Sequence, residues 1–157
     1  MNRLLELEIK LSHFIDEQED KVQLRDETLA WEKIHMASSA RCAWILALER
    51  GIDAELAACA AAVHDFGRIL TGKQKEHAEA GYEPVKLFLE ETGLFTEEEV
   101  ELIALAVKNH SLKTEEGSPI EEVVKDADVI DCWQFGYPFD RPEKELRYQN
   151  WRKTHGI

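Results

Sequence analysis

Apolar residues recur at spacings of three and four along most of the chain, which is the periodicity of amphipathic helices. In the first such segment, Arg3 to about Glu19, one face carries Leu4, Leu7, Leu11 and Phe14/Ile15. No stretch of any length shows the alternation of apolar and polar residues that is typical of a β-strand. The pattern predicts an all-α fold of about six or seven helices, arranged as one compact bundle in a single domain that covers residues 1–157.

Capping residues indicate where the later helices begin and end. We expect helices over about 24–50, 54–64, 76–91, from 97 to about 110, from 119 to beyond 131, and over about 142–153. Gly51 and Gly93 follow two of these helices as C-terminal caps, and Thr96 and Ser118 precede two others as N-caps. The segment 68–75 is predicted to be a short basic connection.

The most apolar stretch, residues 57–63, is followed directly by a histidine and an aspartate. Ala57, Ala60 and Ala61 share one helical face, and His64 continues it. Burying His64 beside Asp65 costs free energy unless both side chains have partners, and a metal ion satisfies both at once. A capping histidine followed by a solvated aspartate also explains this dipeptide when it is taken alone.

Other predicted helices place a histidine or an acid in a similar way. His35 falls on an inward face traced through Trp31, Ser38, Cys42, Ile45 and Leu46, and His110 ends an apolar stripe. Asp128 shares a face with Val124, with Asp126 and Asp131 as competing choices.

Each of these buried groups would need its own partner if it served only to fill the core. Helix bundles build metal sites from inward side chains on facing helices. The sequence therefore predicts a metal site made by His35, His64, Asp65, His77, His110 and Asp128. His13 and His155, near the two ends, are predicted to lie at the surface.

The order of these residues resembles the HD-domain superfamily of metal-dependent phosphohydrolases. Residues 64–68 are similar to the family's His-Asp-x-x-(basic) signature, and residues 77–81 to its second histidine followed by a glycine. Residues 125–131 resemble the family's final Ala-Asp-x-x-Asp segment. The resemblance covers about 32–131 and leaves 132–157 as an aromatic C-terminal extension, which we expect to end in a helix.

The resemblance implies a first metal ion bound by His35, His64, Asp65 and Asp128. His77 and His110 match the positions that bind a second ion in binuclear members, where the carboxylate at the position of Asp65 bridges the two. In mononuclear members, histidines in that region contact the substrate phosphate instead. The presence of all six residues favours two ions.

Imidazole and carboxylate ligands without thiolates suit Mn, Fe, Co, Ni or Mg. Such an ion lowers the pKa of bound water and so provides a nucleophile near neutral pH. We expect Asp65 and Arg68 to be catalytic, and Arg68 to offer phosphate a two-pronged donor. Lys73 and Lys75 are candidates for the entrance, with a solvated surface as the alternative. Some nucleotidase members carry a glutamate where Arg68 stands, so the general acid stays unassigned.

The leading hypothesis is therefore a phosphohydrolase that cleaves a phosphate ester of a nucleotide or a similar small molecule. One alternative is a di-iron oxygenase of the HD type that uses the same six ligands. A second alternative is a non-catalytic domain that binds a ligand or a partner and keeps the metal for its structure.

Composition limits the other partners. A formal net charge of −13 argues against a nucleic-acid surface, which needs a basic patch, but a metal ion can still attract a small anion. No apolar run is long enough for a membrane span, and no signal peptide follows Met1. Cys42, Cys59 and Cys132 form no close pair, which favours reduced thiols and a cytoplasmic location. An exposed aromatic tail suggests a homodimer surface.

Overall fold

The computed structural model describes residues 2–22 and 24–157, and every regular element within them is a helix. The helices are α1 (Arg3–Asp16), α2 (Leu29–Arg50), α3 (Ala54–Val63), α4 (Phe66–Thr71), α5 (His77–Thr92), α6 (Glu97–Asn109), α7 (Pro119–Gln134) and α8 (Pro142–His155). The predicted all-α bundle is confirmed. The described residues form eight helices rather than six or seven, because α4 was not foreseen.

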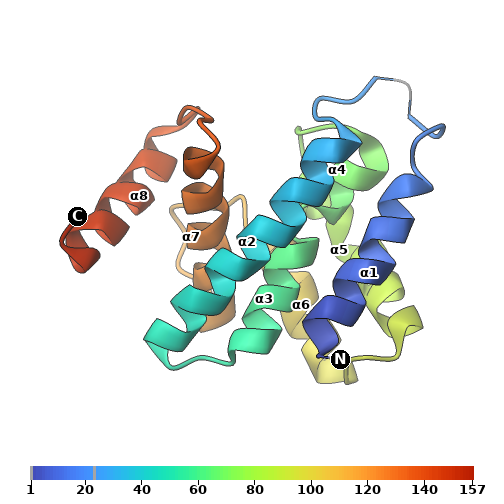
Figure 1. The fold of residues 1–157 in the computed structure, drawn as a ribbon, viewed down its shortest axis with the longest axis horizontal. Coiled ribbons are helices and arrows are strands. Elements are labelled where there is room, and N and C mark those ends of the chain that lie inside the picture. Colours follow the sequence, from blue (N-terminus) through green and yellow to red (C-terminus); the bar gives the residue numbers. More distant parts are fainter. Residues whose placement is uncertain (1, 23) are drawn as a thin grey trace.

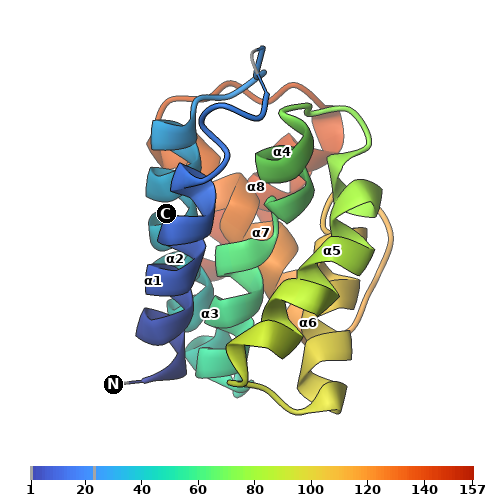
Figure 2. The ribbon, with the colours of Figure 1, turned by 90° about the vertical axis from the view of Figure 1, so that its right-hand side faces the viewer.

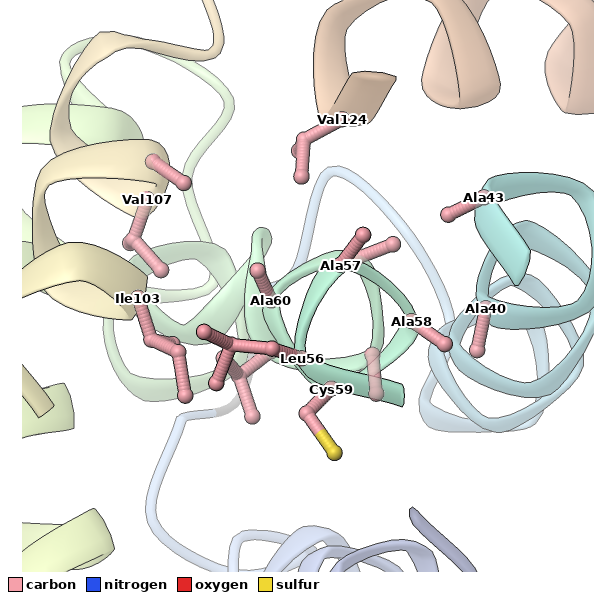
Figure 3. Close-up of a cluster of buried hydrophobic side chains, with 14 of the residues drawn as sticks. Ala40, Ala43, Leu56, Ala57, Ala58, Cys59, Ala60, Ile103, Val107 and Val124 are labelled. Carbon is pink, nitrogen blue, oxygen red and sulfur yellow. The ribbon is translucent and has the colours of Figure 1, made fainter. Parts of the chain in front are cut away.

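Helix α3 is the central element of the bundle, and α1, α2, α6 and α7 pack around it (Figure 2). All nine of its residues named as buried are apolar, and they cover every side of the helix rather than a single stripe, as expected for a helix without a solvent face. Figure 3 shows α3 between Ala40 and Ala43 of α2 and Ile103 and Val107 of α6. Small side chains at these contacts let the helix axes approach closely.

The predicted caps are confirmed. Gly51 and Gly93 adopt the left-handed conformation after α2 and α5, which costs glycine little because it has no Cβ. Thr96 and Ser118 each form a capping box with a glutamate three residues later. The start of α2 differs from the prediction, because the backbone of Thr28 is extended and its hydroxyl caps the Trp31 amide. The helix therefore begins at Leu29 and not near residue 24.

The inward face predicted for α2 is partly wrong. Ile45 is 58% exposed, and the core-facing side consists of Glu32, His35, Met36, Ser39, Ala40, Ala43, Leu46 and Ala47. The face is turned because the closest contact with α3 needs the small residues Ala40 and Ala43.

The predicted basic connection after Gly67 is also wrong, since residues 66–71 form the short helix α4. Phe66 is buried and stacks on Phe14 of α1, with ring centroids 4.8 Å apart. Gly67 lies against the backbone of α5, where a Cβ at this position would be 2.6 Å from the Gly81 nitrogen. The glycines at 67 and 81 thus let two helices touch backbone to backbone.

The C-terminal helix α8 lies at the edge of the bundle beside α7 (Figure 1). It has no fully buried residue, although Tyr148 and Trp151 are half-buried and pack against the core. His13 and His155 are exposed, as predicted. The three cysteines are free, and Cys59 is a buried core residue. No helix in the described part of the chain has the length and apolar character required to cross a membrane.

We expect Gly67→Ala to lower the free energy of unfolding by about 2 kcal/mol, because the added methyl group collides with backbone atoms of α5 that cannot move aside. This cost exceeds the ~1 kcal/mol that alanine gains over glycine in helix propensity. Chemical denaturation measures the change. Ala80→Ser adds one heavy atom to an exposed position on α5 and should change stability by less than about 0.5 kcal/mol. Equal stability of the two variants would contradict the close approach of α4 and α5 at Gly67.

Candidate metal centre

Four of the predicted ligands form a first cluster between α2, α7 and the end of α3. The Nε2 atoms of His35 and His64 are 3.1 Å apart. Asp65 Oδ2 lies 3.4 Å from His35 Nε2 and 3.1 Å from His64 Nε2, and Asp128 Oδ1 lies 3.3 Å and 3.6 Å from the same two nitrogens. Ligands bound to one ion at about 2.0–2.2 Å are themselves separated by roughly 3 Å, so this donor set matches a single cation.

The remaining three ligand atoms form a second cluster at the start of α5 and the end of α6. His77 Nε2 lies 2.9 Å from His110 Nε2 and 3.1 Å from Asp65 Oδ1, and His110 Nε2 lies 3.6 Å from the same oxygen. The two carboxylate oxygens of Asp65 therefore face different clusters. Asp65 is placed to bridge two cations.

When the four rings are neutral, their orientations leave lone pairs in contact, which favours a cation at each cluster. His64, His77 and His110 each donate Nδ1–H to the carbonyl three residues earlier, at 2.6–2.7 Å. His35 donates Nδ1–H to Asp131 Oδ2 at 2.7 Å. These acceptors assign the proton of each neutral ring to Nδ1, so every Nε2 points into the centre as an acceptor. A metal ion between such nitrogens removes the repulsion.

The electrostatics of the two clusters differ. At His64, burial opposes protonation, but Asp65 and Asp128 outweigh it and raise the pKa to about 10. At His110, burial dominates and lowers the pKa to about 3. The acids of the first cluster therefore favour a positive charge there, whereas His110 in the second cluster is kept as a neutral imidazole.

Asp65 itself is held ionised by its neighbours. Burial alone would raise the pKa of Asp65, but Arg68 and His64 outweigh it and hold the pKa well below its usual range. Arg68 Nη2 lies 2.5 Å from Asp65 Oδ2.

Arg68 binds a second acid more extensively. Its Nε and Nη2 donate to the two oxygens of Glu32 at 2.8 and 3.0 Å, and its Nη1 donates to Gln74. The two-pronged edge that was expected to meet phosphate is thus occupied by Glu32.

Asp128 has a buried cationic partner. Lys113 Nζ lies 2.6 Å from Asp128 Oδ2, which leaves Oδ1 facing His35 and His64. Burial would raise the pKa of Asp128, but Lys113 holds it well below its usual range. Of the competing acids, Asp131 orients His35, whereas Asp126 pairs with Arg50 and Arg147 outside the centre.

A cavity of about 260 Å³ opens over both clusters. Asp65, Asp128, His77 and His110 form part of its wall, together with Arg68 and Lys113. The wall also contains Trp31, Cys132, Tyr137, Phe139, Arg141 and Lys144. Lys73 and Lys75 are exposed and do not line it, and Lys73 instead lies 3.5 Å from Asp26.

Comparison with family models agrees with this centre. The model of the HD domain matches residues 33–133, which include all six ligand candidates. The chain belongs to the HD-domain family. Members of this family are generally metal-dependent hydrolases. No curated protein and no solved structure matches the chain significantly.

Three residues near the centre or in the cavity wall, Glu32, Lys113 and Arg141, were not identified from the sequence as part of the site. Lys113 follows the end of an apolar stripe, where a lysine ordinarily serves the helix dipole, although it is buried against Asp128. Glu32 gave no signal beyond its place one turn before His35. Arg141 lies in the aromatic extension, whose side chains the sequence does not place.

We expect the purified HD domain to hold about two divalent ions per chain, falling to about one in His77→Ala, because the first cluster keeps its four ligands. His64→Ala should lose the ion of the first cluster instead. Elemental analysis measures both contents. His13→Ala, on the exposed side of α1, is the control and should keep the wild-type content. If the metal content of His77→Ala equals that of the wild type, the second ion is contradicted.

Arg68→Met should lower the free energy of unfolding by about 3–5 kcal/mol, because it leaves Glu32 and Asp65 as buried charges without their cation. Lys33→Met removes the cation of a pair with Asp16, whose side chain is 68% exposed, and should cost less than about 1 kcal/mol. Denaturant unfolding of both variants tests the contrast. The double variant Glu32→Leu/Arg68→Met should recover part of this loss, because it also removes one of the two unpaired charges. A double variant as unstable as Arg68→Met would contradict this account.

Proposed function

We propose that this HD domain is a metal-dependent phosphohydrolase that cleaves a phosphate ester of a small molecule. The observation that carries the proposal is the carboxylate of Asp65, whose two oxygens face two ligand clusters at the wall of one cavity. This arrangement suits the binding of phosphate oxygens beside an activated water.

The six ligands have defined roles in the proposal. His35, His64, Asp65 and Asp128 would hold one divalent ion, and His77, His110 and Asp65 a second. Bound there, the ions supply a nucleophilic water at neutral pH and neutralise phosphate charge. Mn, Fe, Co, Ni and Mg all suit these ligands.

Arg68 and Lys113 hold the carboxylates of Asp65 and Asp128 in the ionised form that binds a metal ion. We assign Arg68 to positioning: its link to Glu32 fixes the guanidinium, which holds Asp65 ionised and oriented. Lys113 does the same for Asp128 through Oδ2. A role of Arg68 in phosphate binding would require it to leave Glu32, and Lys73 lies outside the cavity wall.

A nucleotide as the substrate, a cytoplasmic location and a homodimer stay predictions from the sequence. The cavity wall supports an aromatic substrate group, since Trp31, Tyr137 and Phe139 line it. Aromatic side chains stack on planar groups such as bases.

The proposal predicts that the Mn²⁺-loaded protein releases phosphate from a panel of sugar phosphates, nucleoside monophosphates and p-nitrophenyl phosphate. Chelation should abolish the release, and added Mn²⁺ should restore it. Asp65→Asn should lose about a hundredfold or more in rate, because it removes a charge shared by both clusters. Asp16→Asn, an exposed control on α1, should retain full activity.

Two results would favour the alternatives. Tight metal binding without turnover across the whole panel would indicate a binding domain. Protein isolated with two irons and an oxygen-sensitive visible band, and without phosphatase activity, would indicate the oxygenase.

A further inference from the structure

One wall of the cavity comes from residues 137–141, which lie beyond the part of the chain that matches the family. Tyr137 stacks on Trp31, with ring centroids 4.6 Å apart, and donates its hydroxyl hydrogen to Glu27 at 3.2 Å. Phe139 stacks on Trp133 of α7 with centroids 5.0 Å apart. The segment is therefore fixed to the chain around the start of α2 and to α7, and it forms an ordered wall.

Arg141 ends this segment, directly before α8, and its side chain is anchored at one nitrogen only. Nη1 donates to the Ser111 carbonyl at 3.1 Å and lies 3.3 Å from Glu143 Oε1. Among the described residues, no hydrogen bond is found for Nε or Nη2, and the ion-pair partner of the guanidinium is Glu143. The Nε–Nη2 edge is the one that forms two parallel bonds with a phosphate or carboxylate group.

The other cations of the wall are engaged. Arg68 has given its Nε–Nη2 edge to Glu32. Lys113 is paired with Asp128 at 2.6 Å, and Lys144 with Asp140 at 2.7 Å. Within the described residues, Arg141 is thus the arginine of this cavity whose two-pronged edge is available to a ligand.

Arg141 also lies where two cavities meet. A second cavity of about 280 Å³ shares six lining residues with the first, namely Gln74, His77, Ser111, Asp140, Arg141 and Lys144. The residue that anchors Arg141, Ser111, directly follows the metal ligand candidate His110. An anion held by Arg141 would therefore lie beside the second ligand cluster, against wall residues that the two cavities share.

We propose that Arg141 binds a phosphate group of the substrate and so determines which phosphate esters the protein accepts. This inference rests on the proposed hydrolase function for its kinetic consequence, but the binding of phosphate by Arg141 can be measured without turnover. Anchoring through Nη1 orients the guanidinium before the substrate arrives, which lowers the ordering cost of binding.

The test uses the full-length, Mn²⁺-loaded protein and titration calorimetry with pyrophosphate and inorganic phosphate as probes. Arg141→Gln should weaken pyrophosphate binding about tenfold or more, as expected for the loss of charge-assisted hydrogen bonds. Arg141→Lys keeps the charge but not the two-pronged edge, and should recover only part of the affinity. Unchanged metal content and melting temperature will show that the variants are folded.

Arg152→Gln is the matched control, because it removes the same charge from an exposed position of α8. It should bind pyrophosphate as the wild type does. Wild-type affinity in Arg141→Gln, or an equal loss in Arg152→Gln, would overturn the proposal.

On any ester that the wild type hydrolyses, Arg141→Gln should raise KM about tenfold and change kcat less than about threefold, since Arg141 binds substrate in ground and transition state alike. A large loss of kcat at constant KM would overturn the assigned role. If no ester is hydrolysed while the pyrophosphate pattern holds, the hydrolase function fails and phosphate binding by Arg141 stands.

Discussion

The burial of one ionised carboxylate is the constraint on which the rest of this structure depends. Asp65 is enclosed by four imidazole rings and the Arg68 guanidinium, and an isolated carboxylate in such a place would be very costly. The charge is tolerable because Arg68 balances it and because a cation held by either ligand cluster would lie beside one of its oxygens. Glu32, which is also buried, in turn balances the charge of Arg68.

This constraint also explains how the helices are arranged. Asp65 lies between α3 and α4, so the apolar helix at the centre of the bundle ends at the charged centre. The first cluster adds ligands from α2 and α7, and the second from α5 and α6. Alanines along α3, and glycines at the contact between α4 and α5, allow six helices to meet at this centre. The arrangement of the ligand candidates therefore depends on the packing of small residues between the helices.

Much of the fold and several of the ligand candidates can be predicted from the sequence, because they depend on local, periodic patterns of residues. Apolar spacing gave the helices, and the caps at Gly51, Thr96 and Ser118 set their ends. Among the six ligand candidates, His35, His64 and His110 lie on or at the end of apolar stripes, whereas the resemblance to the HD family singled out His77 and chose Asp128 among three acids.

Contacts between distant residues have no such signature. Glu32 and Arg68 are separated by 36 positions and Lys113 and Asp128 by 15, and nothing in the spacing pairs them. Arg68 was consequently assigned to phosphate, although Glu32 occupies its edge. The short helix α4 was missed because it is held by tertiary contacts of Phe66 and Gly67, and six residues are too few to show a period.

The hydrogen bonds of the histidine Nδ1 atoms have a consequence for folding. Three of the four rings are oriented by a carbonyl only three residues earlier in the chain. The orientation of His64 and His110 is therefore set by the last turns of α3 and α6, and that of His77 by the turn that precedes α5, without a contact between distant helices. His35 is the exception, because it needs Asp131 from α7. Assembly of the centre then requires docking of pre-aimed rings rather than a search through side-chain rotamers, which reduces the conformational entropy lost when a cation binds.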